Sequence, residues 1–415
     1  MSYPKGTLFQ ALPPRLRERA RIARSSEILA SCSSQYVLYW QRNTLRAHEN
    51  PALDTAVHLA NSLSQPLRIL LEVDDQYPHS TPRYQLFKLE GARECVAEYS
   101  KRGLGENVVF HVGRWLHSDS GKRAESPLPQ LIQSASVVVA EEPFCVPWLE
   151  GIERLSRALP PAAALWLVDT ACVVPCQLVP EDACHRAWQY EKATKDFLNA
   201  RINLEWDEYA LQRPGSASKN PEQTLGAFDS CFSASQGAAF SDEDLFNLVL
   251  SMERSFETEI QKSAKPVSHL TAGGSSPGYR RWTAWLSRGG LKTYAKTRNE
   301  ALDPLSVSRM SAYLNLGMVS PFRLARQVFR SSGSGKQKFM NEFLTWRGVS
   351  YAWCYHIQMP SSGATTAQLP AWAKQTLEKH RQDPRPVNVA AERMAGGATG
   401  FNRAWDALQQ YMVFL

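Results

Sequence analysis

The sequence contains few cysteines and lacks any long apolar run. Eight cysteines are scattered along 415 residues, which is typical of free thiols in a reducing compartment rather than of a disulfide scaffold. No apolar stretch approaches the roughly 18 to 20 residues that a membrane helix needs, and the N-terminus has no secretory apolar core. We therefore expect an intracellular protein of the cytoplasm, nucleoid or nucleus, without a membrane partner.

The cysteines also lack the spacing of a usual zinc knuckle. One cluster combines Cys172, Cys176 and Cys184 with His185. Its intervals differ from those of common zinc sites, and the apolar residues between the first two cysteines resemble the end of a strand. The sequence therefore predicts no metal site.

Acidic residues are outnumbered, because Lys and Arg total 47 against 40 Asp and Glu, which gives a net charge of +7. A basic surplus suits a polyanionic partner such as nucleic acid if the charge gathers on one face, although charge alone does not establish one. Arginines are dense between residues 13 and 24, where only Glu18 opposes them. We predict a solvated basic helix in this lead-in region, 1–34, with an organelle presequence as the alternative.

Short apolar runs recur through the first 180 residues, each about as long as a strand. They lie at 36–40, 67–73, 108–112, 137–140 and 165–168. Between them are helical periodicities, such as the face formed by Leu53, Ala56, Val57, Ala60 and Leu63. This alternation predicts a Rossmann-like α/β domain at 35–180, with a buried parallel sheet.

The glycine-rich fingerprint of dinucleotide-binding domains is absent after the first predicted strand. The turn there reads Gln41-Arg42-Asn43-Thr44, without the G-x-G-x-x-G pattern that lets a backbone approach a pyrophosphate. We therefore do not expect this domain to bind NAD in the usual way.

The chain changes character after the α/β region. Gly- and Ser-rich stretches around residues 214–218 and 233–237 bury little surface and favour open chain, so we predict a linker at 181–240. From Asp242 onward the apolar spacing becomes helical, as in the stripe of Leu245, Leu248, Val249 and Met252. We expect an all-α domain at 241–415.

Two patterns in this helical region could perform chemistry. The first is the segment from Ser306 to Ser311, which we call the cradle, where hydroxyls, a guanidinium and the free N–H groups of a helix start could donate hydrogen bonds to phosphate oxygens. The alternative is an ordinary serine N-cap. The second is Glu342 and Trp346, which lie four residues apart and so share a helix face. They could point into one cavity, or they could be a surface ion pair and a core tryptophan.

In their order and spacing, several segments resemble the photolyase/cryptochrome family, and class II photolyases in particular. The matching segments are 36–46, 50–53, 87–91, 173–175, 294–299, 306–321, 341–347, 369–373 and 404–409. The resemblance extends over nearly the whole chain. It implies an antenna domain at 35–180 and an FAD-binding domain at 241–415.

The resemblance also implies cofactor-binding residues. The diphosphate of FAD would be held by Val307, Ser308, Arg309, Met310 and Ser311. Tyr294 would pack on the cofactor, and Arg347 would lie beside it as a charge partner. The α/β domain of the family holds an antenna pigment, a deazaflavin or a folate.

The implied activity is that of a deoxyribodipyrimidine photo-lyase acting as a monomer on damaged DNA. Reduced FAD, excited by light, would give one electron to a cyclobutane pyrimidine dimer, whose ring then splits. Trp346 would stack on the flipped dimer and Glu342 would hydrogen-bond it. Trp405 matches the middle member of the family's electron-transfer tryptophans.

Departures from the family pattern favour a second interpretation. Gly348 and Ala352 replace a Glu and a polar residue of relatives, which removes hydrogen-bond capacity expected near the cofactor. The chain ends at Leu415, where relatives continue through further helices, so we expect an incomplete FAD-binding domain. The alternatives are a cryptochrome-like or degenerate FAD photoreceptor or interaction protein without repair activity, and an electron-transfer flavoprotein without DNA contact.

Overall fold

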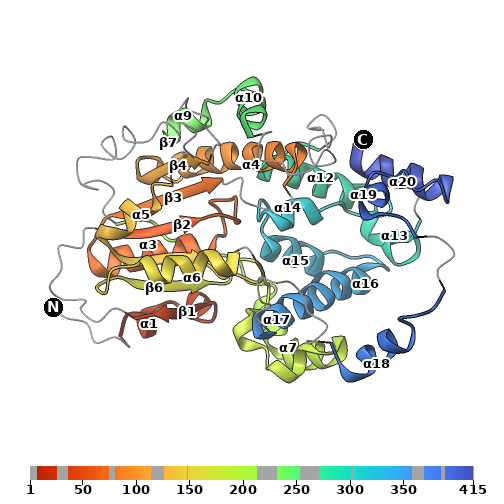
Figure 1. The fold of residues 1–415 in the computed structure, drawn as a ribbon. Helices are drawn as coiled ribbons and strands as arrows, with labels where there is room; N and C mark the ends of the chain where they lie inside the picture. The colour runs from red at the N-terminus through yellow and green to blue at the C-terminus, as the bar shows by residue number, and fades with distance from the viewer. Residues whose placement is uncertain are drawn as a thin grey trace.

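A computed structural model describes the fold (Figure 1). It describes residues 7–25, 36–73, 80–113, 126–146, 148–212, 231–252, 271–300, 303, 305–357, 369–384 and 388–414. Among these residues, no helix has both the length and the apolar character that crossing a bilayer requires.

Seven strands form one sheet in the order β1-β6-β5-β2-β3-β4-β7. The five inner strands are parallel: β2 (Tyr36–Gln41), β3 (Leu67–Val73), β4 (Val108–Val112), β5 (Ala135–Glu141) and β6 (Ala164–Val168). Every residue in them is buried, as expected when helices cover both faces of a parallel sheet. The five predicted strands and the Rossmann-like α/β fold are confirmed.

Helices cover the sheet on both sides (Figure 1). Helices α3 (Pro51–Leu63) and α4 (Pro82–Lys101) share one apolar core with it, and α6 (Trp148–Ala158) shares another. Helix α3 begins at Pro51 because Asn50 accepts hydrogen bonds from the N–H groups of Ala52 and Leu53, at 3.1 and 3.2 Å. The predicted face of α3 is therefore real and lies against the sheet.

The two outer strands run antiparallel and were not predicted. Strand β1 (Ala20–Arg24) pairs with β6, where we expected a solvated basic helix. In the described part of this lead-in region, residues 7–25, only the short helices α1 (Thr7–Ala11) and α2 (Pro14–Arg17) are helical. The arginines on β1 and just before it are not simply solvated. Arg21 makes two hydrogen bonds to Glu142, at 2.6 and 2.7 Å, and the buried Arg19 donates to the carbonyls of Cys172 and Val173. These partners lie over 100 residues away, so local sequence could not reveal them.

Much of the predicted linker has regular structure. Residues 181–201 contain the 3₁₀ helix η4 (Glu181–Cys184) and helix α7 (Ala187–Arg201). Residues 231–238 form β7 (Cys231–Ser233), which pairs with β4, and the short helix α9 (Ala234–Ala238). Ser233 and Gln236 start α9 as a capping box, so open chain was the wrong expectation here. The other Gly/Ser stretch, at 214–218, lies outside the described residues.

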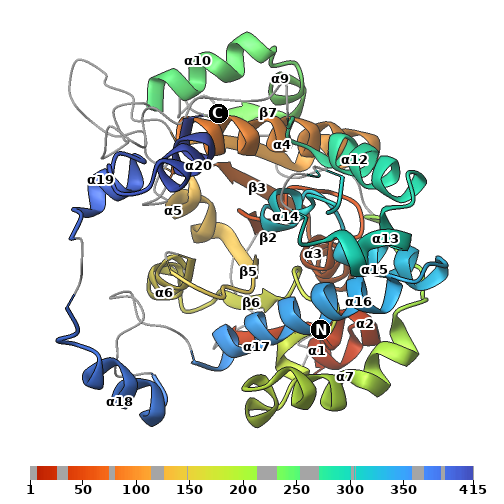
Figure 2. The same cartoon turned by 90° about the vertical axis from the view of Figure 1, so that its right-hand side faces the viewer.

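The second half of the chain is helical, as predicted. Its elements are α10 (Asp242–Met252), α12 (Ser275–Ser287), α13 (Gly290–Thr297), α14 (Ser311–Asn315), α15 (Pro321–Arg330), α16 (Lys336–Met340), the π-helix η6 (Asn341–Trp346), α17 (Arg347–Ile357), α18 (Ala371–Lys379), α19 (Ala391–Ala395) and α20 (Arg403–Phe414). Figure 2 shows α17 lying beside α7, as it also does in Figure 1. The buried stripe of α10 packs on α4 of the α/β part.

The α/β and helical parts are joined by a polar seam. Arg46 donates to the carbonyl of Gly317 at 2.7 Å, and Glu49 forms an ion pair with Arg326 at 2.6 Å. Nε2 of His48 lies 2.7 Å from the hydroxyl of Tyr279. One apolar core also continues from the sheet into α12, α14 and α15. These contacts fix the carboxyl ends of the strands against the helices.

Candidate functional site

The predicted phosphate cradle lies between α13 and α14. Arg309 is exposed and has a φ of 53°, in the left-handed region that non-glycine residues seldom occupy. Ser311 is exposed as the first residue of α14, and that helix start has no side-chain cap. Val307 and Ser308 are half-buried, while Met310 is buried. A guanidinium, a hydroxyl and an uncapped helix start therefore meet at one exposed turn.

The hydroxyl of one serine in the cradle is already hydrogen-bonded within the protein. The hydroxyl of Ser306 donates to the carbonyl of Asp303 at 2.8 Å, and the residue is buried. It holds the turn to the segment that follows α13. This serine is therefore structural, and the groups open to a ligand are those of Arg309 and Ser311.

Tyr294 packs on the aromatic core of the helical part. Its ring meets Trp285 at 6.0 Å and Phe339 at 5.2 Å between centroids, both edge-on, and the side chain is half-buried. Burial, with the nearby Glu342 carboxylate, raises the pKa of its hydroxyl. These aromatic contacts fix the position of Tyr294, and its role beside a flavin stays a prediction.

Glu342 and Trp346 lie at the two ends of the π-helix η6. The carboxylate of Glu342 forms an ion pair with Lys338 at 2.5 Å, and both side chains are about one-third exposed. Trp346 is 50% exposed. The alternative of a surface ion pair is therefore realised for Glu342, whereas Trp346 is not a core residue. π-Helices are rare in proteins, and those that occur are often found at functional sites.

Arg347 and its neighbours on α17 face the α/β part instead. The Arg347 guanidinium donates to the carbonyl of Ala171 at 2.7 Å and lies 4.6 Å from the centroid of the Tyr351 ring. A Cβ atom added to Gly348 would lie 2.1 Å from the hydroxyl of Tyr190, and Ala352 is fully buried in the same cluster. The two replaced positions thus have a packing reason that the sequence did not suggest.

Trp405 is the remaining predicted residue, on α20. It is 40% exposed, and its backbone N–H is bonded to the side chain of Asn402 at 3.0 Å. Further apolar side chains between the start of α18 and the middle of α20 are also exposed, namely Trp372, Leu377, Met394, Phe401 and Leu408. Trp405 therefore lies on a largely exposed apolar segment.

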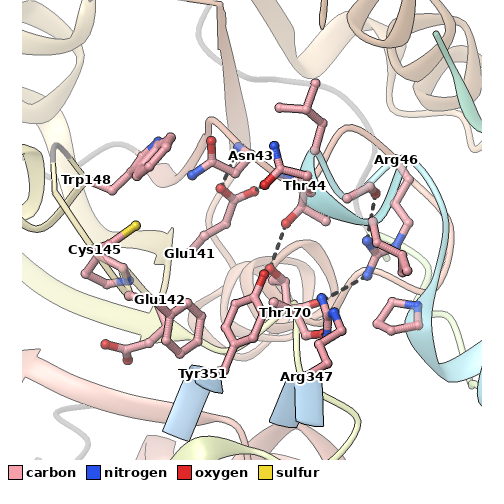
Figure 3. A pocket seen from close by; sticks show the side chains of 18 of the residues that line it. Asn43, Thr44, Arg46, Glu141, Glu142, Cys145, Trp148, Thr170, Arg347 and Tyr351 are labelled. Carbon is pink, nitrogen blue, oxygen red and sulfur yellow. Dashed lines mark hydrogen bonds between the residues drawn. The ribbon is translucent and has the colours of Figure 1, made fainter. Parts of the chain in front are cut away.

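A cavity of about 110 Å³ opens at the carboxyl ends of β2, β5 and β6 (Figure 3). Between β2 and β5 the strand order reverses, the position where open α/β sheets bind ligands. Its polar lining includes Asn43, Thr44, Glu141, Thr170 and Arg347. The buried Oδ1 of Asn43 has no hydrogen-bond partner among the described residues. We call this the switch-point cavity.

Most charged side chains around the switch-point cavity are hydrogen-bonded to other groups of the protein. The carboxylate of Glu141 accepts the N–H groups of Asn43 and Thr44, both at 2.8 Å, a longer bond from Arg42, and the hydroxyl of Tyr39. It thereby closes the turn after β2. Burial lowers the pKa of the Arg46 guanidinium, which donates to three backbone carbonyls.

A second cavity, of about 340 Å³, lies along α4. Its lining includes Tyr84, Phe87 and Glu90 of α4, together with Thr271 and Ala312. Ala312 follows Ser311 directly, so this α4 cavity adjoins the cradle. Tyr84 lines both cavities.

Sequence reasoning missed the lining of both cavities except Arg347, which it placed beside the flavin. The signal was available in part, because Glu141, Thr44 and Thr170 each end or follow an apolar run predicted as a parallel strand. The missing information was the strand order, which decides whose carboxyl ends become neighbours. Nothing local predicts that Arg347 turns toward Ala171.

Comparison with known proteins identifies relatives of both parts. The family model described as DNA photolyase matches residues 37–200. A deoxyribodipyrimidine photo-lyase of Methanothermobacter thermautotrophicus is 26% identical over 387 residues, covering 91% of this chain and 74% of that protein. Another, of Arabidopsis thaliana, is 25% identical and covers 91% and 70% of the two chains.

Among solved structures, the fold is similar to that of a bacterial class III photolyase from Agrobacterium tumefaciens. The TM-score is 0.57 at 16% identity, covering 93% of this chain and 70% of that one. At this identity the likeness concerns the fold alone. It includes the α/β sheet and the helical part together.

Proposed function

Because the chain belongs to the DNA photolyase/cryptochrome family, we propose that it splits cyclobutane pyrimidine dimers in DNA with light. The observation that carries the proposal is the continuous match of 91% of the chain to a deoxyribodipyrimidine photo-lyase. That match includes the α/β part, the cradle and the helix with Trp346. A surplus of basic residues, with a net charge of +7, suits a DNA substrate.

We propose FAD as the cofactor, and the cradle fits its diphosphate chemically. An exposed arginine, an exposed serine hydroxyl and uncapped N–H groups are donors suited to phosphate oxygens. Arg309 and Ser311 would hold the diphosphate, and the backbone of Val307, Ser308 and Met310 would surround it. Tyr294 would pack against the flavin. Bound in its reduced form, FAD supplies the light-driven electron for ring splitting.

The protein's own contribution is to hold the flipped dimer. Trp346 is half-exposed, so its indole can stack on a base. Glu342 would exchange its ion pair with Lys338 for a hydrogen bond to the dimer, while Lys338 could turn to a phosphate. An exposed ion pair is worth at most about 1 kcal/mol, so this exchange costs little.

Two further assignments follow from the family. Trp405 would relay electrons to the flavin from the exposed helix α20. The antenna pigment, a deazaflavin or folate, would occupy the α4 cavity, whose about 340 Å³ falls within the roughly 300–1,000 Å³ usual for ligands. The switch-point cavity, of about 110 Å³, does not fit a whole pigment. We assign no light-harvesting step to it.

A cryptochrome-like role without repair is the second candidate. One observation favours it: the carboxylate that should read the dimer is engaged with Lys338. Such a protein would keep the flavin but would not need Trp346 and Glu342. Repair and flavin binding must therefore be measured separately.

The deciding experiment exposes purified, reduced, flavin-loaded protein to blue light with a thymine-dimer oligonucleotide and follows recovery of intact thymines. Recovery in light and none in the dark supports the lyase. Bound flavin without recovery overturns the lyase in favour of the cryptochrome-like role. Failure to bind flavin contradicts both.

A substitution at Arg309 tests the role of the cradle in FAD binding. Arg309→Gln keeps a side chain of similar length at the left-handed position but removes the charge. Losing a charged hydrogen bond costs about 1.5–3 kcal/mol, so FAD should bind roughly 10- to 150-fold more weakly. Arg288→Gln, at an exposed arginine ending α12, is the matched control and should leave FAD affinity unchanged. Equal losses in the two variants would contradict the assignment.

A further inference from the structure

A buried group of two thiols and a carboxylate lies in the loop that leaves β6. Asp169, Cys172 and Cys176 have exposures of 3%, 1% and 1%, and one potential ligand atom of each lies within 4.8 Å of the others. The two sulfur atoms are 3.5 Å apart. Cys184 and His185, which the sequence grouped with these cysteines, are not part of the group. The thiol of Cys184 instead donates to the carbonyl of Glu181.

The loop is already held in the shape that brings these atoms together. One oxygen of Asp169 accepts the N–H groups of Ala171 and Cys172, and the other accepts that of Cys176 at 3.1 Å. On the outer side, the carbonyl of Cys172 accepts from Arg19 at 2.6 Å. The carbonyl of Ala171 accepts from Arg347. Ligand atoms that are positioned by other bonds lose little freedom when they bind an ion.

We propose that Asp169, Cys172 and Cys176 bind a divalent cation of the zinc class. In a tetrahedral site with Zn–S bonds of about 2.3 Å, two sulfur atoms lie roughly 3.8 Å apart. The observed 3.5 Å is near this separation. A disulfide would need the sulfur atoms to approach to about 2.05 Å. Thiolates with one carboxylate suit zinc or cobalt better than the all-oxygen sites of magnesium and calcium.

Charge balance also favours a divalent ion. The binding step is the exchange of two thiol protons for one cation: two metal–sulfur bonds form, two S–H bonds break, and two protons leave to solvent. The charge buried in the loop does not change. A monovalent ion would leave an extra negative charge among apolar neighbours such as Val174, Val179 and Ala352.

The surroundings explain why the thiols are otherwise inert. Burial raises the pKa of both Cys172 and Cys176, and the nearby Arg19 and Arg347 partly offset this for Cys172. Thiols with a raised pKa and almost no exposure are poor partners for disulfide exchange. An ion acquired during folding would face no such barrier. Three protein ligands leave a fourth position for a solvent molecule.

The site would fasten the junction between the two parts of the molecule. The loop joins β6 to the segment carrying α7. Burial raises the pKa of the hydroxyls of Tyr190 on α7 and Tyr351 on α17, and the nearby Cys172 and Asp169 add to the shift. A bound ion would therefore raise the unfolding temperature of the whole chain. This inference does not depend on flavin or on DNA repair.

Cobalt titration of the reduced, metal-free full-length protein tests the proposal. We expect one Co²⁺ per chain, with a thiolate-to-cobalt charge-transfer band, release of two protons and displacement of cobalt by zinc. Cys172→Ser and Cys176→Ser should abolish the band. Cys184→Ser, a buried cysteine of the same apolar cluster, is the matched control and should retain it.

Folding is checked in each variant by circular dichroism. Asp169→Asn keeps one oxygen, which can accept the N–H groups of Ala171 and Cys172, but it loses the acceptor of the Cys176 N–H. The folded variant should bind cobalt at least about tenfold more weakly. A folded, reduced wild-type protein that gives no band overturns the proposal. So does a band that survives both serine substitutions. Isolation of the chain with a Cys172–Cys176 disulfide that leaves no free thiol pair would also overturn it.

Discussion

The polar groups of the α/β part and those of the helical part differ in how far the protein itself satisfies them. In the α/β part, Glu141 at the end of β5 accepts bonds from three backbone N–H groups of the turn after β2 and from one hydroxyl. In the helical part, Arg309 and Ser311 are exposed and Trp346 is half-exposed. A group whose bonds are all internal is committed to the fold, whereas an open group is available to a ligand. Polar side chains thus have two different uses in one chain.

The largest expected effect is a loss of stability when the carboxylate acceptor in the α/β part is removed. Glu141→Ala would leave the N–H groups of Arg42, Asn43 and Thr44 without their acceptor. Each lost partner costs about 1–3 kcal/mol, so we expect the free energy of unfolding to fall by about 3–5 kcal/mol. Urea unfolding measures it.

Glu150→Ala is the control for this variant. Glu150 is a surface residue of α6, 3.7 Å from Arg154, and its loss should cost less than about 0.5 kcal/mol. A similar small loss for Glu141→Ala would show that the turn after β2 does not depend on the carboxylate.

Substitution of Trp346 probes the helical side. Stacking of a base on an aromatic ring is worth about 1–3 kcal/mol, so Trp346→Ala should weaken binding of dimer-containing DNA roughly 5- to 150-fold while the protein keeps its stability. Fluorescence anisotropy in the dark separates binding from repair.

The matched control is Trp372→Ala. Trp372 is 71% exposed on α18, more than Trp346, but it does not lie near Glu342 in the sequence or on η6. If both substitutions weaken binding equally, indole exposure alone explains the effect and the proposed stacking wall is wrong.

A smaller expected effect concerns how the stability of the α/β part depends on pH. Asp54 is buried in α3, where it accepts bonds from Trp206 and Arg102. Burial raises its pKa from 3.8 to about 6, although Arg102 opposes the shift. Because the folded state binds this proton more tightly than the unfolded state, the contribution of Asp54 to stability is largest below pH 4 and is lost as pH rises through about 6.

Asp54→Asn should remove this dependence. The difference in unfolding free energy between wild type and variant should change by about 1 kcal/mol per pH unit between pH 4 and 6, and little outside that range. Guanidinium unfolding at four pH values measures it. A difference that does not vary with pH would mean that Asp54 titrates alike in both states.

The inner sheet could be predicted because its signals are local. Each run such as 108–112 is apolar throughout, since both faces of a parallel strand are covered. Strands β1 and β7 carry no such signal, because they lie at the sheet's edges and depend on distant partners. Arg21, for example, is placed by Glu142. Sequence indicated neither strand.

For the candidate site, the sequence motifs predicted which residues take part but not where their side chains point. The resemblance implied both Tyr294 and Glu342 as site residues, and the Glu342 carboxylate lies near enough to help raise the pKa of the Tyr294 hydroxyl, after burial. Arg347 follows Trp346 directly, yet its side chain crosses to Ala171, because α17 packs on the loop after β6. Asp169 was missed as a possible ligand because only the folded loop brings it to Cys176. The functions assigned to the site residues remain predictions.

Hydrogen exchange of the protein with and without FAD tests most directly whether the flavin lies in the helical part. Our account predicts slower exchange at 305–315 and 341–346 when FAD binds, and no change at 41–46 and 141–144 around the switch-point cavity. Slowing confined to those two strand-end segments, with the cradle unaffected, would contradict it.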